Sequence, residues 1–174
     1  VGLRGAAAVS RVLVTVGTDH HPFQRLVTWA EDFAQRHPEH EVFIQYGTAL
    51  PPRNGSRSRL LDHAQLQREI SRADAVVCHG GPATITDVRR SGLVPICIPR
   101  DPEHDEHIDC HQLKFVQRLA EVGLITWAQE VAALDGLVQD ALARPRVSAG
   151  ASDAPTGARR VGDLISRLSA APGT

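Results

Sequence analysis

The sequence alternates between short apolar runs typical of buried strands and longer amphipathic segments typical of helices. The first pair is the β-branched run Arg11–Gly17, followed by a helical stripe of apolar residues from Phe23 to Ala34. Apolar runs without polar alternation belong to strands that are covered on both faces, as in a parallel sheet. Parallel strands need long crossover connections, and the intervening helical segments supply them. The alternation therefore predicts an α/β fold, a Rossmann-like parallel sheet with helices on both faces.

The same alternation continues to the neighbourhood of residue 143. Further strands are expected at Glu41–Gly47, Asp74–His79, Val94–Pro99 and Leu124–Trp127. Further helices are expected at Ala64–Arg72, Pro82–Arg90 and Val131–Ala143, with another helical stripe from Leu113 to Ala120 that stops at Gly123. The segment Pro51–Arg59 holds two prolines, a glycine and three arginines, which is typical of a polar loop.

The length of 174 residues fits one domain and leaves no room for a two-lobed enzyme. We assign residues 11–145 to this domain. Residues 146–157 are rich in Pro, Gly, Ser and Ala, and they predict a flexible connection. Residues 158–171 predict an amphipathic helix that packs on the domain or on a partner.

Composition excludes several classes of protein. The formal net charge of −1 lacks the basic excess of a nucleic-acid binder. No apolar run approaches the ~18 residues of a membrane span, so no direct membrane span is expected. Cys78, Cys97 and Cys110 are an odd number and widely spaced, and two of them lie in apolar runs. This pattern favours reduced thiols and a cytoplasmic protein.

Polar segments follow three of the expected strands, at positions 17–21, 79–84 and 100–112. In an open parallel sheet, ligands bind at the carboxyl ends of the strands, near the point where the strand order switches. In the middle segment, Gly80 and Gly81 let the backbone approach a ligand, and the helix that starts at Pro82 offers unpaired N–H groups and a positive dipole end. Such a site suits a diphosphate, with Thr84 as a further donor and Asp87 as an acceptor for a ribose diol. A plain tight turn would also explain the two glycines.

Taken in order, Val14–Thr18, His79–Asp87 and Asp109–Gln112 resemble the donor-binding half of the family 28 glycosyltransferases. The resemblance extends from about residue 11 to residue 125. It is greatest to the short, split members of the Alg13 and PssE/EpsF kinds, rather than to full-length MurG. It implies the C-terminal lobe of a GT-B enzyme that takes a UDP-sugar as substrate, with no cofactor and no metal. It also implies a membrane-anchored acceptor-binding partner subunit of the Alg14/PssD kind, which would hold this chain at the membrane periphery.

The resemblance assigns roles to individual positions. The residues from Gly80 to Thr84 would hold the diphosphate, Asp87 the ribose, and His111 with Gln112 the sugar. Ala83, Asp87 and Cys110 stand where the family usually has Gly, Glu and Asn. Because Asp is one methylene shorter than Glu, its reach to the ribose falls short by ~1 Å, enough to lengthen a hydrogen bond. The expected substrate-binding residues are Gly17, Thr18, His79, Gly80, Gly81, Pro82, Ala83, Thr84, Asp87, His111 and Gln112.

Two further groups of histidines have more than one interpretation. His20 and His21 follow the first strand and are either candidates for a general base or solvated loop residues. Because the resemblance places the base on the other lobe, neither is assigned to catalysis. His104, His107 and His111 have spacings that a metal ion could use. They lie in an acidic loop and at a helix start, so no metal is expected there.

These observations predict the donor-binding subunit of a split, inverting UDP-sugar glycosyltransferase. It would act on a lipid-linked acceptor in polysaccharide biosynthesis and transfer sugar only in complex with its partner. Two alternatives stay open. One is a non-catalytic module that binds a nucleotide-sugar. The other is a UDP-sugar hydrolase or epimerase of related fold, with His20 or His21 as its own base.

Overall fold

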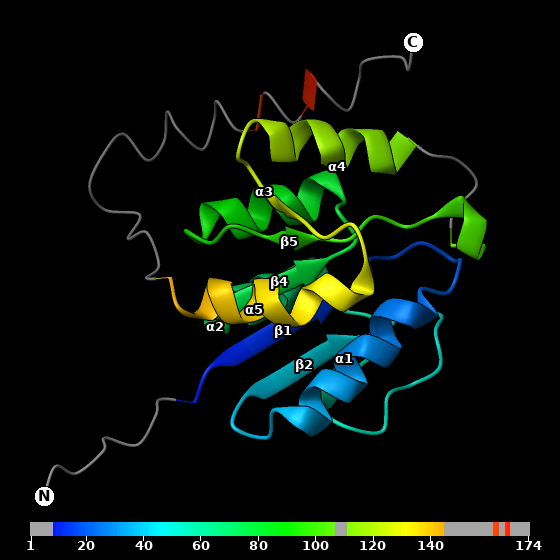
Figure 1. Cartoon of the computed structure of the whole chain (residues 1–174), viewed down its shortest axis with the longest axis vertical. Helices are drawn as coiled ribbons and strands as arrows, with labels where there is room; N and C mark the ends of the chain where they lie inside the picture. Colours follow the sequence, from blue (N-terminus) through cyan, green and yellow to red (C-terminus); the bar gives the residue numbers. More distant parts are fainter. Residues whose placement is uncertain (1–8, 107–110, 145–161, 164–165, 168–174) are drawn as a thin grey trace, which may run out of the picture.

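A computed structural model describes residues 9–106, 111–144, 162–163 and 166–167. Six strands form one sheet in the order β3-β2-β1-β4-β5-β6, and every neighbouring pair is parallel. This confirms the predicted α/β class. Figure 1 labels β2, β1, β4 and β5, the four central strands of this order. The strands are β1 (Arg11–Thr15), β2 (Glu41–Gln45), β3 (Ser56–Ser58), β4 (Ala75–Cys78), β5 (Ile96–Cys97) and β6 (Thr126–Trp127).

The strand order reverses between β1 and β4. The chain runs outward from β1 through β2 to β3, returns to place β4 on the other side of β1, and then runs outward again to β6. At such a switch point the connections leave the two neighbouring strands in opposite directions, and a crevice opens outside their carboxyl ends. The segments that follow β1 and β4 are therefore the positions where the fold favours a ligand.

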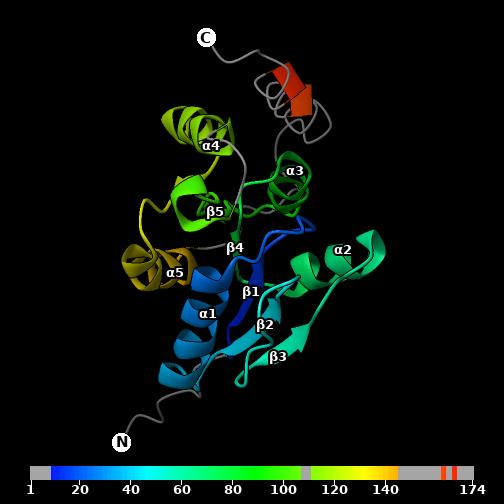
Figure 2. The same ribbon diagram turned by 90° about the vertical axis from the view of Figure 1, so that its right-hand side faces the viewer.

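Helices cover both faces of the sheet. Figure 2 shows α1 and α5 on one side and α2 and α3 on the other. Alternate residues of β1 supply the two cores: Val12 and Val14 pack under α1 and α5, and Leu13 packs under α2 and α3. α4 packs with α3 over Cys78 and Cys97. The helices are α1 (Gln24–Arg36), α2 (His63–Arg72), α3 (Pro82–Arg90), α4 (His111–Glu121) and α5 (Leu134–Leu142), with single 3₁₀ turns η1 (Pro102–His104) and η2 (Val131–Ala133).

The structure corrects three details of the sequence analysis. The expected loop 51–59 contains β3, a short edge strand that pairs with β2 through its backbone. Its Ser and Arg side chains are mostly exposed, so they carry no apolar signal. β5 has only two residues, because Pro95 and Pro99 flank it and have no N–H to donate to a ladder. The helix expected over residues 131–143 is divided into η2 and α5.

Several expectations concern the chain ends and thiols. Cys78 and Cys97 are free and buried, as predicted. Cys110, the connection 146–157 and most of the helix expected at 158–171 lie outside the described residues. Within the described part of the chain, no helix combines the length and the apolar character that a membrane crossing requires.

Candidate functional site

The loops that follow β1 and β4 meet at the switch point, around the imidazole of His79. A Cβ placed on Gly17 would lie 2.5 Å from His79 Cε1, and one placed on Gly81 would lie 2.4 Å from His79 Nε2. Gly17 also has a φ of +78°, which other residues rarely adopt. The structure thus brings the predicted site residues Gly17, His79 and Gly81 together, and it shows why two of them are glycines.

Gly80 connects this loop to α4. Its φ is +89°, and a Cβ here would meet Val116 Cγ2 at 2.4 Å. The missing side chain lets the end of β4 lie directly against α4. α4 therefore starts beside the same crevice, and its first two residues are His111 and Gln112. Asp109 and Cys110, the other members of this motif, lie outside the described residues.

The start of α3 is the predicted diphosphate site. Its N-cap residue is Gly81, and no side chain caps the helix. The first intrahelical bond is the one that Ile85 donates to the Gly81 carbonyl oxygen at 3.0 Å. The N–H groups of Ala83 and Thr84 precede it and have no acceptor within the helix. Together with the positive end of the helix dipole, they form a site for an anion.

Asp87 lies one turn further along α3 and is buried. Its carboxylate is 3.9 Å from Nδ1 of His63, the first residue of α2, and 3.8 Å from Nη1 of Arg90. The start of α2 therefore contributes to the same edge of the sheet. His63 was missed in the sequence analysis, because no motif includes it and its position depends on how α2 packs beside α3.

Arg100 joins the loops around the crevice. The sequence analysis included it in the polar segment 100–112 but gave it no role of its own. Its side chain is 1% exposed and is stacked over the ring of Phe23, 5.0 Å from the ring centroid. Its guanidinium donates to the carbonyl oxygens of His21 (2.6 Å), Val16 (2.8 Å) and Glu106 (3.2 Å). Burial lowers the pKa of Arg100, and the nearby carboxylates of Asp19 and Glu106 oppose that change. The loop after β1 is thus fastened to the loop after β5.

The same loop holds Gln112. Its side-chain oxygen accepts a hydrogen bond from the backbone N–H of Arg100 at 3.0 Å. This bond fixes the orientation of the amide at the start of α4. Glu106, which is 3% exposed, accepts from Arg25 Nε at 2.7 Å and from the Asp101 backbone N–H at 3.0 Å. These contacts anchor the segment that connects β5 to α4.

Asp19 and His21 form a pair at the mouth of the crevice. Oδ1 of Asp19 lies 2.7 Å from His21 Nδ1 and also accepts the His21 backbone N–H at 2.8 Å. Burial raises the pKa of Asp19, but the hydrogen bonds from His21 and the charge of Arg100 outweigh it and hold that pKa below its ordinary value. The side chain of His20 is 80% exposed, and Thr18 is exposed beside it. Of the two candidate bases, His21 lies within hydrogen-bond distance of the Asp19 carboxylate, whereas Nδ1 of His20 is 3.9 Å from Asp19 Oδ1.

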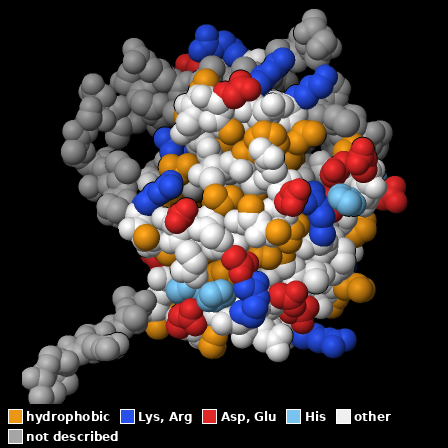
Figure 3. All heavy atoms as spheres, in the orientation of Figure 1, with side chains coloured by type: hydrophobic (Ala, Val, Ile, Leu, Met, Phe, Trp, Pro, Cys, Tyr) orange, Lys and Arg blue, Asp and Glu red, His pale blue; other side chains and the backbone are white. Residues whose placement is uncertain are grey.

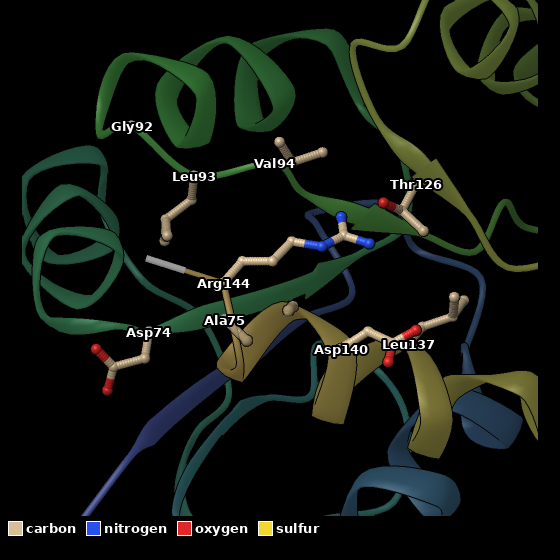
Figure 4. Close-up of a pocket in the computed structure, with 10 residues that line it drawn as sticks. Asp74, Ala75, Gly92, Leu93, Val94, Thr126, Leu137, Asp140 and Arg144 are labelled. Carbon is tan, nitrogen blue, oxygen red and sulfur yellow. The ribbon is translucent and has the colours of Figure 1, made fainter. Parts of the chain in front are cut away.

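Two hollows lie at opposite edges of the sheet. One of ≈ 380 Å³ borders the crevice through Arg100. A smaller one of ≈ 100 Å³ lies at the amino ends of β4, β5 and β6 (Figure 4). The larger hollow is lined by Arg25, Pro99, Arg100, Asp101, His104, Leu113, Gln129, Glu130 and Val131. The smaller one is lined by Asp74, Ala75, Gly92, Leu93, Val94, Thr126, Leu137, Asp140, Ala141 and Arg144.

The sheet order and the glycine-lined, uncapped helix start at its switch point define a Rossmann-like α/β domain. Residues 11–161 match the glycosyltransferase family 28 C-terminal domain. The chain belongs to this family. No curated protein matches it significantly.

Solved structures of glycosyltransferases share the fold. The glycotransferase of kitacinnamycin is 19% identical, with a TM-score of 0.63 over 96% of this chain and 45% of that protein. SnogD from Streptomyces nogalater is 21% identical, with a TM-score of 0.52 over 93% of this chain and 41% of that protein. MurG from Acinetobacter baumannii is 20% identical, with a TM-score of 0.53 over 92% of this chain and 51% of that protein. The chain thus spans about half the length of these proteins and corresponds to a single lobe of the GT-B fold.

Proposed function

We propose that this domain binds the UDP-sugar donor of an inverting glycosyltransferase whose acceptor binds on a separate lobe. The observation that carries the proposal is the uncapped start of α3, which faces a glycine-lined crevice at the switch point of the sheet. Membership of a glycosyltransferase family supports a nucleotide-sugar as the ligand.

In the proposed reaction, a hydroxyl oxygen of the acceptor attacks the anomeric carbon from the face opposite UDP. The bond between that carbon and the UDP oxygen breaks, and UDP leaves with the electron pair. The N–H groups of Ala83 and Thr84 stabilise the charge that develops on the diphosphate. In this proposal, Asp87 and the neighbouring His63 bind the ribose, and Gln112 binds the sugar.

The acceptor and the base that takes its proton belong, in this proposal, to a partner lobe. The support is that the similar structures are about twice as long as this chain. Leu50 and Leu60, which follow β2 and β3, are 73% and 54% exposed, and they offer apolar surface for a second lobe near the same edge. The resemblance noted in the sequence favours a membrane-anchored partner subunit and a lipid-linked acceptor in polysaccharide synthesis.

The Asp19–His21 pair favours a second candidate, hydrolysis of the nucleotide-sugar by this chain alone. The carboxylate holds Nδ1 of His21 and directs Nε2 away from it, so that Nε2 can accept a proton from water. Release of free sugar from a UDP-sugar by the isolated chain, lost in His21→Ala, would establish this candidate in place of the first.

The test of the first candidate is calorimetric titration of UDP into the full chain. We expect binding without sugar transfer, and at least tenfold weaker binding in Gly81→Ala, because the new Cβ would displace His79. Gly136→Ala is the matched control, since a Cβ there meets nothing within 4 Å, and it should bind UDP as the parent does. Absence of UDP binding at millimolar concentration, or equal binding by both variants, would contradict the proposal.

A further inference from the structure

A cluster of histidine and carboxylate side chains lies at the end of α1, far from the crevice. α1 ends at Arg36 and β2 begins at Glu41, so the cluster is at the amino end of a strand, whereas the crevice is at the carboxyl ends. Figure 3 shows histidine side chains beside acidic and basic ones low on this face, near the end of α1 in Figure 1. The residues are His37, Glu39 and His40, in the sequence His-Pro-Glu-His.

The ligand atoms of the three residues converge. Glu39 Oε1 lies 3.1 Å from His37 Nδ1 and 3.8 Å from His40 Nε2, and all three atoms lie within 4.8 Å of one another. Zinc bound tetrahedrally at about 2.0–2.1 Å separates its ligand atoms by about 3.3–3.5 Å. The observed separations bracket that value, so small side-chain rotations would complete the geometry.

The surroundings hold the two imidazoles in place. Phe33 packs against His37 at a centroid distance of 4.5 Å, and its ring is parallel to that of His40 within 9° at 6.1 Å. The other nitrogen of His37, Nε2, lies 4.0 Å from Asp135 Oδ2. This separation is too long for a hydrogen bond. A small shift of either side chain would give His37 the carboxylate support that metal-ligating histidines usually have.

Charges at the cluster suit a cation. The carboxylate of Glu39 brings a negative charge to the two imidazoles. The positive charge of the neighbouring Arg36 is neutralised by its ion pair with Asp135. Gln139 of α5 places its amide 3.4 Å from His40 Nε2, and a half-turn of that amide would present its oxygen instead.

We propose that His37, Glu39 and His40 bind a divalent transition metal, specifically Zn²⁺. Two imidazoles and one carboxylate are a donor set that zinc accepts. The site is structural and separate from the donor crevice, so zinc binding should raise the melting temperature and leave the affinity for UDP unchanged. If zinc binds only the native state, a free zinc concentration one hundred times the dissociation constant should raise the melting temperature by about 5 °C.

The test is calorimetric titration of ZnCl₂ into the full chain, prepared without a histidine tag and stripped with EDTA. We expect one zinc per chain, with affinity falling at least tenfold in His37→Ala and in Glu39→Gln. Because Glu39 is exposed, Glu39→Gln should keep the melting temperature of the zinc-free protein, which separates loss of a ligand from misfolding.

His20→Ala/His21→Ala is the matched control, since Asp19, His20 and His21 form the other such cluster among the described residues. This double variant should bind zinc as the parent does. The proposal is overturned if zinc binds more weakly than about 100 µM, if the control abolishes binding, or if Glu39→Gln leaves the affinity unchanged.

Discussion

At the scale of single residues, Arg100 organises the candidate site without belonging to a recognisable motif. Its guanidinium donates to three backbone carbonyl oxygens in two loops, and its own backbone N–H holds Gln112. A buried carbonyl group that loses its donor costs about 1–3 kcal/mol. Arg100 is therefore a positioning residue that keeps the loops after β1 and β5 beside one another.

We expect Arg100→Met to lower the free energy of unfolding by about 3 kcal/mol or more, because three carbonyl groups lose their donor. Urea unfolding followed by circular dichroism measures this. Arg100→Lys keeps the charge but not the planar set of donors, so its free energy of unfolding should lie between those of Arg100→Met and the parent. Arg57→Met, an exposed arginine of β3, should stay within about 0.5 kcal/mol of the parent. A loss below 1 kcal/mol in Arg100→Met would contradict this account.

At the scale of elements, α2 and α3 start at the same edge of the sheet, but their first turns are capped differently. At α2, Asp62 Oδ1 accepts the Gln65 N–H at 2.7 Å, and Gln65 Oε1 accepts the Asp62 N–H at 2.8 Å, which completes a capping box. At α3, the N-cap residue is Gly81, which has no side chain to accept a hydrogen bond from the first turn. A helix that a ligand caps does not need a side chain in that place. Because α1 and α5 also start without a side-chain cap, the glycine-lined crevice in front of α3, and not the missing cap alone, marks it as the candidate site.

We expect Asp62→Ala to destabilise the protein by about 1 kcal/mol, the usual contribution of an N-cap. Asp62→Asn keeps an acceptor at the cap and should lie within a few tenths of a kcal/mol of the parent. Urea unfolding of the two variants side by side makes the comparison. Equal stability of Ala and Asn at this position would show that the capping box contributes nothing.

At the scale of the whole molecule, Asp135 connects the first and the last helix of the domain, which are far apart in the sequence. This residue of α5 accepts from Trp29 Nε1 at 2.7 Å and forms an ion pair with Arg36, both on α1. The hydrogen bond from Arg36 and that from Trp29 lower the pKa of Asp135, while burial opposes them. The contacts fasten the last helix of the domain to the first across the face of the sheet.

Asp135→Asn should cost about 1 kcal/mol at pH 7, a value reduced because the ion pair is partly exposed. Since folding lowers the pKa of Asp135, its contribution is present above the ordinary value of 3.8 and is lost as the pH falls through the lowered value. The difference in unfolding free energy between the parent and Asp135→Asn should therefore shrink between pH 5 and pH 3. Urea titrations over that range, with EDTA present, check it, and a difference that grows toward acid would contradict the account.

The sequence by itself determined the α/β class, the helix that starts at Pro82 and the glycines at the crevice. Strand and helix periodicity, proline at a first helical turn and glycine before a helix act over a few neighbouring residues, so they are visible locally. Only the tertiary structure decided that Arg100 joins two loops, that His63 lies beside Asp87, and that Asp135 lies 4.0 Å from His37. These partners are separated by 24 to 98 positions in the chain, and strand order and helix packing alone bring them together. The edge strand β3 was missed for a different reason: its pairing with β2 uses backbone groups that every sequence has.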